Sequence, residues 1–164
     1  MSESHNIHNI HATGIVLDGI GVILRGPPGS GKSVLALDLL DWWEARGLPA
    51  RLVSDDRVEI IAENGKLTMH PAPNIAGLIE LRGRGIVSRP HVDAARVDLV
   101  VDLVETLERM LEDEALTTEL FGVSVARAPV PQAGIVDGRH QSLLVREAIR
   151  TLGSPAGTAR QKTT

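Results

Sequence analysis

The chain has 164 residues, and at roughly 100–200 residues per domain this length predicts one globular domain. Hydrophobic residues make up 43% of the chain and charged residues 23%, a balance that excludes collagen-like and wholly disordered chains. The net charge of -4 and the presence of only one Phe and two Trp argue against nucleic-acid binding. Cysteine is absent from the sequence, which excludes disulfides and thiolate chemistry.

The N-terminal residues are polar and rich in histidine, a pattern unlike that of a secretory signal. The sequence has no apolar run near the ~20 residues that cross a bilayer. We therefore expect a cytoplasmic protein that does not bind membranes. The predicted organisation is a polar tail over residues 1–9, one domain over residues 10–153 and a disordered tail over residues 154–164.

The first predicted elements are two strands within residues 14–25, joined by a tight turn at Asp18 and Gly19. A loop rich in glycine follows directly. Residues 33–46 then show helical apolar spacing, and Gly47 stands where helices commonly end. The chain therefore begins with two strands, a loop and a helix.

The next segment predicts a short strand over residues 50–54 that ends at Asp55 and Asp56. Further on, Asn64 and Gly65 stand between two apolar runs, which is a strong signal for a β-hairpin. Carboxylates are thus expected at the point where a strand stops.

The second half of the chain predicts one helical turn over residues 75–79, a loop over residues 80–85 and a buried central strand over residues 97–104. A charged helix or loop is expected over residues 105–119, a further strand over residues 121–130, and a closing helix over residues 140–152 that is ended by Gly153. The expected fold class is therefore α/β, with a mixed β-sheet and flanking helices.

The motif G-x-x-x-x-G-K-[ST] is matched in full between a predicted strand and a predicted helix, which is the context of a phosphate-binding P-loop. Backbone N–H groups at such a helix start can hold phosphate oxygens. The lysine can reach the terminal phosphates and the serine can bind Mg²⁺. The predicted binding residues are Gly26, Pro27, Pro28, Gly29, Ser30, Gly31, Lys32 and Ser33. We expect a nucleoside triphosphate or a related phosphate as ligand.

Two strand ends offer a carboxylate for the metal ion, namely Asp55 with Asp56, and Asp102. Adjacent acids can supply one group for the metal's water shell and one for proton transfer, whereas Asp102 is followed by further apolar residues. We favour Asp55 and Asp56. The alternative is that these two acids only cap a turn.

His11 and the charged residues near Glu80 allow two interpretations. His11 stands before the first predicted strand and could reach the phosphates, or it could belong with His5 and His8 to a solvated tail. Glu80 and Arg82 lie in an E-x-R-G-x-G segment, which can present an acid and a guanidinium group to a metal–phosphate complex. They could equally be idle surface charges.

Three blocks, HATGIVLDGIGVILRGPPGSGKS, LVSDDRVEI and LIELRGRGIV, together resemble the catalytic domain of HPr kinase/phosphorylase, in particular its short bacterial members. The resemblance is clear over residues 10–87 and continues weakly to the end of the chain. It implies a single P-loop-containing domain that uses ATP and Mg²⁺ to phosphorylate a serine of an HPr-like phosphocarrier protein of the phosphotransferase system. It also implies the reverse step, in which inorganic phosphate removes the phosphoryl group as pyrophosphate.

The resemblance implies roles for individual residues. Lys32 matches the P-loop lysine of the family, and Ser33 and Glu80 match its magnesium ligands. His11 matches the active-site histidine, at the same distance before the first P-loop glycine. Asp56, the second acid of the pair, matches the residue that takes the serine proton forward and returns it in reverse.

Later parts of the chain follow the family pattern less closely. Arg109 is the match to a further catalytic arginine, in a loosely aligned stretch. Residues 88–97 do not resemble the glycine-rich loop that helps to hold the protein substrate. Only Gly138 and Arg139 correspond to residues of the family's C-terminal motif I-P-V-R-P-G-R-N. A nucleotide-sensing module without catalysis and a small-molecule kinase therefore stay open as alternatives, as does the family's hexamer as oligomeric state.

Overall fold

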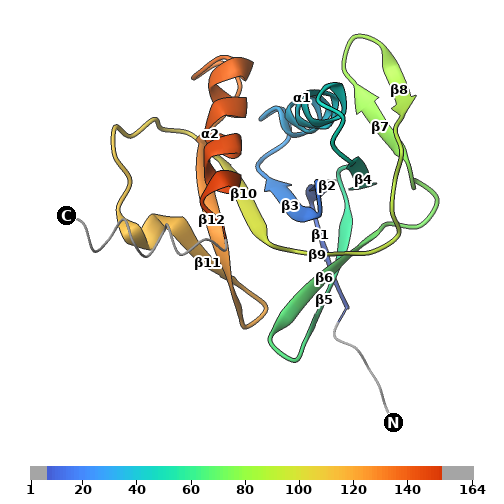
Figure 1. Ribbon diagram of the computed structural model, residues 1–164, viewed down its shortest axis with the longest axis horizontal. Helices are drawn as coiled ribbons and strands as arrows, with labels where there is room; N and C mark the ends of the chain where they lie inside the picture. Colours follow the sequence, from blue (N-terminus) through green and yellow to red (C-terminus); the bar gives the residue numbers. More distant parts are fainter. Residues whose placement is uncertain (1–6, 153–164) are drawn as a thin grey trace.

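A six-stranded sheet lies at the centre of the computed structural model, which describes residues 7–152 (Figure 1). Its strand order is β11-β12-β10-β3-β2-β4. The pairs β12–β10 and β10–β3 are parallel and the other pairs are antiparallel. The sheet is therefore mixed, and the α/β fold class predicted from the sequence is confirmed.

A four-stranded sheet of order β1-β5-β6-β9 and a two-stranded sheet formed by β7 and β8 complete the strands. The strands are β1 Ile7–Ile10, β2 Ala12–Leu17, β3 Ile20–Arg25, β4 Ala50–Ser54, β5 Val58–Glu63, β6 Lys66–Pro71, β7 Leu78–Leu81, β8 Gly85–Ser88, β9 Ala95–Arg96, β10 Leu99–Val104, β11 Thr117–Leu120 and β12 Val123–Pro131. The helices are α1 Lys32–Ala45, α2 Gly138–Arg150 and the short 3₁₀ helix η1 Asp113–Leu116.

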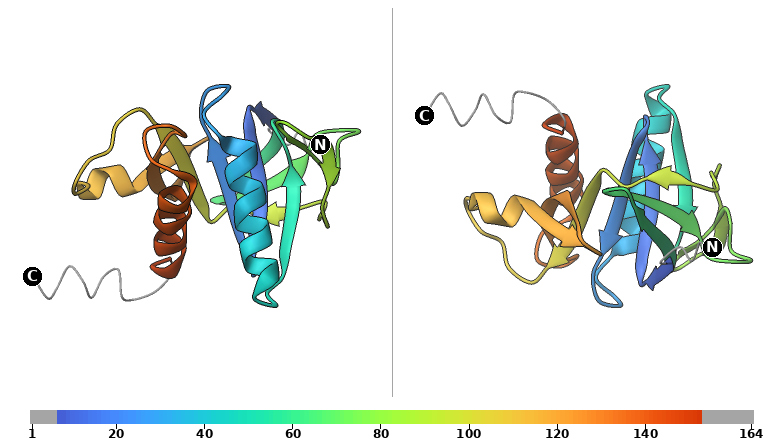
Figure 2. Two further views of the ribbon diagram at one scale, coloured as in Figure 1. Left: turned by 90° about the horizontal axis from the view of Figure 1, so that it is seen from above. Right: turned by 90° about the horizontal axis from the view of Figure 1, so that it is seen from below.

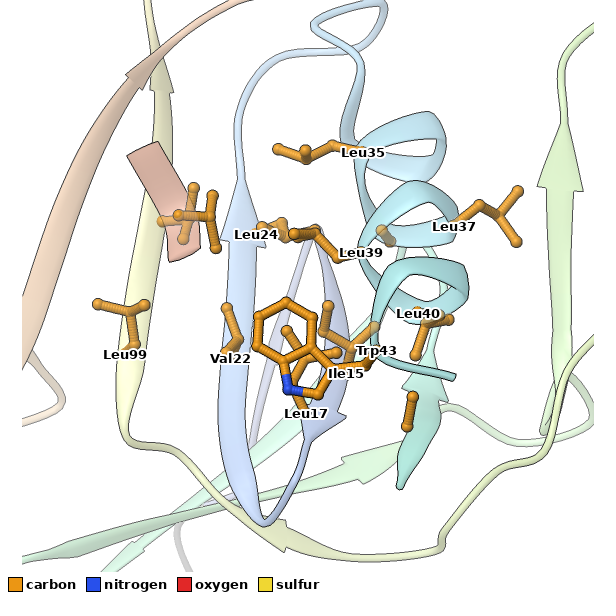
Figure 3. Packing of buried hydrophobic residues seen from close by; sticks show 14 of the residues in the cluster. Ile15, Leu17, Val22, Leu24, Leu35, Leu37, Leu39, Leu40, Trp43 and Leu99 are labelled. Atoms are coloured by element: carbon orange, nitrogen blue, oxygen red, sulfur yellow. The ribbon is translucent and has the colours of Figure 1, made fainter. Parts of the chain in front are cut away.

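The two long helices pack on one face of the central sheet (Figure 2). Alternate residues of each central strand point to this face, as the period of a strand requires. Leu35, Leu39 and Trp43 of α1 pack there against aliphatic side chains of β2 and β3 (Figure 3). Trp43 is thus a core residue.

The opposite face of the central sheet packs against the four-stranded sheet. Ile23 and Val100 of the central sheet belong to one buried cluster with Ile60 and Met69 of the second sheet. The aliphatic composition therefore supplies two hydrophobic cores, one on each face of the central sheet. Each buried side chain contributes about 1.5–3 kcal/mol to the driving force for folding.

Local signals in the sequence predict several elements correctly. The turn at Asp18 and Gly19 joins β2 to β3, and the turn at Asn64 and Gly65 joins β5 to β6. Gly47 has a φ of 75° directly after α1, and the N–H of Leu48 donates to the carbonyl of Trp43. This geometry is typical of a helix end at glycine.

Residues 105–119 are mainly irregular, with η1 and then β11, in keeping with the loop alternative of the prediction. Two other segments differ from the predictions. Residues 75–79 do not form a helical turn, because Asn74 and Gly77 adopt φ values of 71° and 76°, which a right-handed helix does not allow. The strand β1 begins at Ile7, inside the expected polar tail, and pairs with β5. The predicted C-terminal tail and Gly153 lie outside the described residues.

In residues 7–152, none of the helices has the length and apolar character that crossing a bilayer demands.

Candidate active site

The loop between β3 and α1 has backbone features that suit a phosphate-binding loop. Gly29 and Gly31 have φ values of 82° and 103°, which glycine adopts without strain. α1 starts after Gly31 with no side chain capping its N-terminus. The first N–H groups of the helix are therefore available to an anion, at the positive end of the helix dipole.

Lys32 folds back across this loop. Its Nζ donates hydrogen bonds to the carbonyl oxygens of Gly26 at 2.7 Å and Pro27 at 3.3 Å. The loop is tightly packed, because a Cβ added at Gly26 would lie 2.6 Å from Oγ of Ser30. That same Oγ is buried and has no hydrogen-bond partner within residues 7–152. The loop thus contains the ammonium group of Lys32 and the unpaired hydroxyl of Ser30, and both are groups that donate hydrogen bonds to phosphate oxygens.

Asp55 is the centre of the hydrogen-bond network beside the loop. Its Oδ1 accepts hydrogen bonds from the hydroxyl of Ser33 at 2.7 Å and from the hydroxyl of Thr13 at 3.0 Å. Its Oδ2 accepts from the backbone N–H of Glu80 at 3.1 Å. The side chain is only 8% exposed. One carboxylate therefore joins β2, the start of α1 and β7.

The irregular pairing of β2 with β4 helps to bring Asp55 to this place. Gly14 pairs with Ser54 and Ile15 pairs with Leu52, so Val53 is an extra residue in β4. Such a bulge bends a strand and redirects the residues that follow it. The acidic pair comes directly after the bulged strand.

Asp56 and His11 are exposed at the same end of the central sheet. Asp56 has a φ of 68°, a left-handed conformation that few non-glycine residues adopt. His11 lies in the bend between β1 and β2, and the pairing of Ala12 with Arg25 puts it at the end of the sheet where the loop begins. Both residues thus lie at the end of the central sheet from which the loop leaves β3.

Glu80, Arg82 and Arg109 are held less closely. The backbone of Glu80 is fixed by Asp55, while its side chain is exposed. Arg82 lies in the turn between β7 and β8, and Arg109 lies in the exposed irregular segment after β10. Within residues 7–152 the side chains of these three residues form no hydrogen bond or ion pair.

Asp102 is engaged in a different interaction. Its carboxylate forms ion pairs with Arg25 at 2.7 Å and with Arg127 at 2.6 Å. Burial by itself would raise the pKa of Asp102, but the hydrogen bonds and positive charges of the two arginines outweigh burial and hold this pKa below its usual value of 3.8. Asp102 is therefore already paired with two cations, which favours Asp55 and Asp56 over Asp102 as the acids that serve the metal ion and proton transfer.

Sequence analysis did not single out Thr13, Arg25 or Arg127. The position of Arg25, one residue before the P-loop glycine, is the only local signal for its closeness to the site. The contacts of Thr13 and Arg127 depend on the pairing of strands that are far apart in sequence, because Thr13 and Asp55 are 42 positions apart.

The oxygen donors of this site fit Mg²⁺ and a nucleoside triphosphate. Mg²⁺ is usually bound by one or two carboxylates together with substrate phosphates, and it retains several waters. Ser33 offers a hydroxyl at the start of α1, and Glu80, whose backbone N–H bonds to Asp55, carries an exposed carboxylate. Within the described part of the chain, no group of three or more His, Cys, Asp or Glu side chains forms a metal-binding cluster. A metal ion here would thus depend on phosphate oxygens for much of its coordination.

Comparisons with known proteins agree on one family. The sequence model described as HPr Serine kinase C-terminal domain matches residues 3–156. Proteins named HPr kinase/phosphorylase from Streptococcus thermophilus and Streptococcus pneumoniae are 34% and 32% identical to this chain over 152 and 164 residues. These alignments cover 85% and 90% of this chain but 46% and 48% of those proteins. The chain thus spans about half the length of these curated relatives.

A solved structure gives the same result. The structure of the Hpr(Ser) kinase/phosphatase from Coxiella burnetii matches with a TM-score of 0.68 and 26% sequence identity. The match covers 95% of this chain and 98% of that chain.

Proposed function

Because this chain belongs to the family of the HPr serine kinase C-terminal domain, we propose that it is a phosphotransferase acting on a protein serine. The donor is ATP with Mg²⁺, and the acceptor is a seryl hydroxyl of an HPr-like phosphocarrier protein of the phosphotransferase system. One observation carries the proposal: Asp55 connects the P-loop serine to an adjacent exposed acid, Asp56. A site that only senses nucleotide has no need for that second acid.

The loop residues supply electrostatic stabilisation. Lys32 leaves its loop carbonyls to meet the terminal phosphates, and the free N–H groups at the start of α1 hold phosphate oxygens. The Ser33 hydroxyl donates a hydrogen bond to Asp55, and its lone pairs would be available to Mg²⁺, with Glu80 as the second protein ligand. Mg²⁺ would neutralise charge that develops on the phosphates. Positioning and charge stabilisation provide most of the acceleration in phosphoryl transfer.

Asp56 is the proton acceptor of the proposed reaction. The serine oxygen forms a bond to the γ-phosphorus, the bond to the β,γ-bridging oxygen breaks, ADP leaves, and the seryl proton passes to Asp56. In the phosphorolysis reaction an oxygen of inorganic phosphate forms a bond to the phosphorus of phosphoserine, the bond from this phosphorus to the serine oxygen breaks, Asp56 returns the proton to that oxygen, and pyrophosphate leaves. His11, Arg82 and Arg109 are proposed to contact the transferred phosphoryl group or its donor.

Phosphate transfer from γ-labelled ATP to a purified HPr-type carrier protein tests this proposal. Lys32→Ala is expected to lower transfer by about 10²–10³-fold, because a charge-stabilising donor is lost. Asp56→Asn is expected to lower transfer by about 10²–10⁴-fold, because the proton acceptor is lost. Nucleotide binding by Asp56→Asn, measured by calorimetry, is expected to stay close to that of the unsubstituted protein.

Matched controls are available on the surface. Lys66→Ala and Asp38→Asn remove exposed charges of the same kind and should leave transfer unchanged. Acid-stable label on the carrier identifies phosphoserine. Tight ATP binding without label on the carrier would contradict the kinase and favour the sensor, whereas label on a metabolite in place of the carrier would favour a small-molecule kinase.

A further inference from the structure

Thr13 is a buried threonine of β2 whose hydroxyl contacts both acids of the pair. It is 0% exposed, and a buried hydroxyl is costly unless it is hydrogen bonded. Its Oγ1 donates to Oδ1 of Asp55 at 3.0 Å and accepts a hydrogen bond from the backbone N–H of Asp56 at 3.3 Å. One hydroxyl thus uses its donor and its acceptor on neighbouring acidic residues.

These bonds hold the turn that presents Asp56. The backbone of Asp56 has a φ of 68°, which side chains rarely allow. On the other side of the turn, Oγ of Ser54 donates to the carbonyl of Arg57 at 2.6 Å and accepts from the N–H of Ala72 at 3.1 Å. The direction in which the Asp56 side chain leaves the backbone therefore depends on Thr13 and Ser54.

We propose that Thr13 is the positioning residue of the acidic pair. It fixes Asp55 where that carboxylate meets Ser33, and it fixes the backbone of Asp56 in the same place. It thereby couples the metal-binding half of the site to the proton-transfer half. This inference rests on the proposed function, because only there does Asp56 accept the seryl proton.

Two substitutions separate the hydroxyl from the shape of the side chain. Thr13→Val keeps nearly the same shape and removes both hydrogen bonds, whereas Thr13→Ser keeps the hydroxyl. We expect Thr13→Val to lower kcat for carrier phosphorylation by about 10–100-fold and to change KM for ATP by less than about threefold. Thr13→Ser should restore most of kcat. Thr118→Val, a substitution of the same kind in β11, should behave like the unsubstituted protein.

A second measurement needs no nucleotide. Amide hydrogen exchange followed by NMR reports whether the N–H of Asp56 is bonded in the free protein. Thr13→Val should speed the exchange of this N–H by up to about tenfold, as expected for the loss of one hydrogen bond. Thr13→Ser and Thr118→Val should leave it unchanged. Thermal unfolding of each variant checks that the fold is retained.

The outcomes separate this inference from the proposed function. If the unsubstituted protein phosphorylates the carrier and Thr13→Val does so with unchanged kcat, the positioning role is wrong and the kinase stands. If Thr13→Val lowers kcat and Thr13→Ser lowers it by as much, the positioning role is also wrong, since the hydroxyl would then not be the cause of the loss. If the unsubstituted protein transfers no phosphate, the proposed function fails and this inference fails with it.

Discussion

The carboxylate of Asp55 links three segments that are far apart in the sequence. It accepts hydrogen bonds from Thr13 in β2, from Ser33 in α1 and from the N–H of Glu80 in β7. Both oxygens are used as acceptors, and an ionised carboxylate offers only acceptors. The residue therefore matters for the stability of the fold as well as for the site.

This geometry predicts the effect of Asp55→Asn on stability. The amide replaces one acceptor oxygen with an NH₂ group, so at least one buried donor loses its partner. We expect the free energy of unfolding to fall by about 1–3 kcal/mol. Asp38→Asn, on the exposed face of α1, should change it by less than about 0.5 kcal/mol. Urea denaturation measures both, and equal losses in the two variants would contradict the prediction.

Among the elements, β3, β10 and β12 are joined by a polar network as well as by their backbones. Asp102 of β10 pairs with Arg25 of β3 and Arg127 of β12, and Arg127 also donates to the carbonyl of Ala115 at 3.0 Å. The network therefore ties η1 to the strand that leads into the P-loop.

The lowered pKa of Asp102 makes this network sensitive to acid. The arginines favour the deprotonated carboxyl in the folded state, whereas in the unfolded chain this carboxyl titrates near its usual value of 3.8. Its contribution to stability is thus complete above about pH 5 and is lost as the pH falls through the lowered pKa. We expect the difference in unfolding free energy between the unsubstituted protein and Asp102→Asn to shrink between pH 5 and pH 3.

Urea denaturation across this pH range measures that difference. Asp41→Asn is the control, because Asp41 pairs with Arg89 at the surface and is 55% exposed. Exposed pairs contribute little, about 0–1 kcal/mol. A difference for Asp102→Asn that does not change with pH would contradict the role assigned to its ionisation.

Elements with local signals could be predicted from the sequence, and elements that depend on distant partners could not. The strand, glycine-rich loop and helix of residues 20–45 and the Asn64–Gly65 hairpin carry their own turn chemistry, so the arrangement of both was predicted correctly. The strand β1 was missed because its short polar sequence forms a strand only by pairing with β5. Residues 75–79 look helical by spacing, but left-handed residues on the preceding turn redirect the chain into β7.

For the site, the motif predicts the loop and the strand end predicts the acids, and the structure places Asp55 within hydrogen-bond distance of Ser33 at the start of α1. The hydrogen bond between Asp55 and Ser33 could not be derived, because it depends on β4 lying beside β2 at the edge of the central sheet. The ion pairs of Asp102 likewise depend on the register of β10 with β3 and β12. The roles of all the predicted site residues stay predictions.

At the scale of the whole molecule, the central sheet and the four-stranded sheet approach each other closely at Gly21 of β3. Its N–H donates to the Asp98 carboxylate at 2.9 Å, and its carbonyl accepts from the N–H of Asp98 at 2.8 Å. A Cβ added at this glycine would lie 1.7 Å from the carbonyl oxygen of Arg96 in β9. The close approach of the sheets therefore requires glycine here.

Gly21→Ala is accordingly expected to destabilise the protein strongly. The backbone of β9 must move away from β3, and overpacking of this kind costs about 1–3 kcal/mol or more. Gly138→Ala is the matched control, because a Cβ added at the start of α2 meets no atom within 4 Å. That variant should be neutral or slightly stabilising. Thermal unfolding compares the two variants. Similar melting temperatures would contradict the prediction, because they would show that β9 can move away from β3 at little cost in stability.

The strand β4 ends the central sheet on one side, yet its outer edge is covered. The N–H of Leu52 donates to the carbonyl of Pro90 at 2.8 Å, and the N–H of Val92 donates to the carbonyl of Leu52 at 3.0 Å. Exposed strand edges invite pairing with other chains and thus aggregation. The backbone of residues 90–92 therefore shields this part of the edge from strand addition by another molecule, close to the acidic pair. At the other edge of the sheet, the short length of β11 and its charged Glu119 serve the same end.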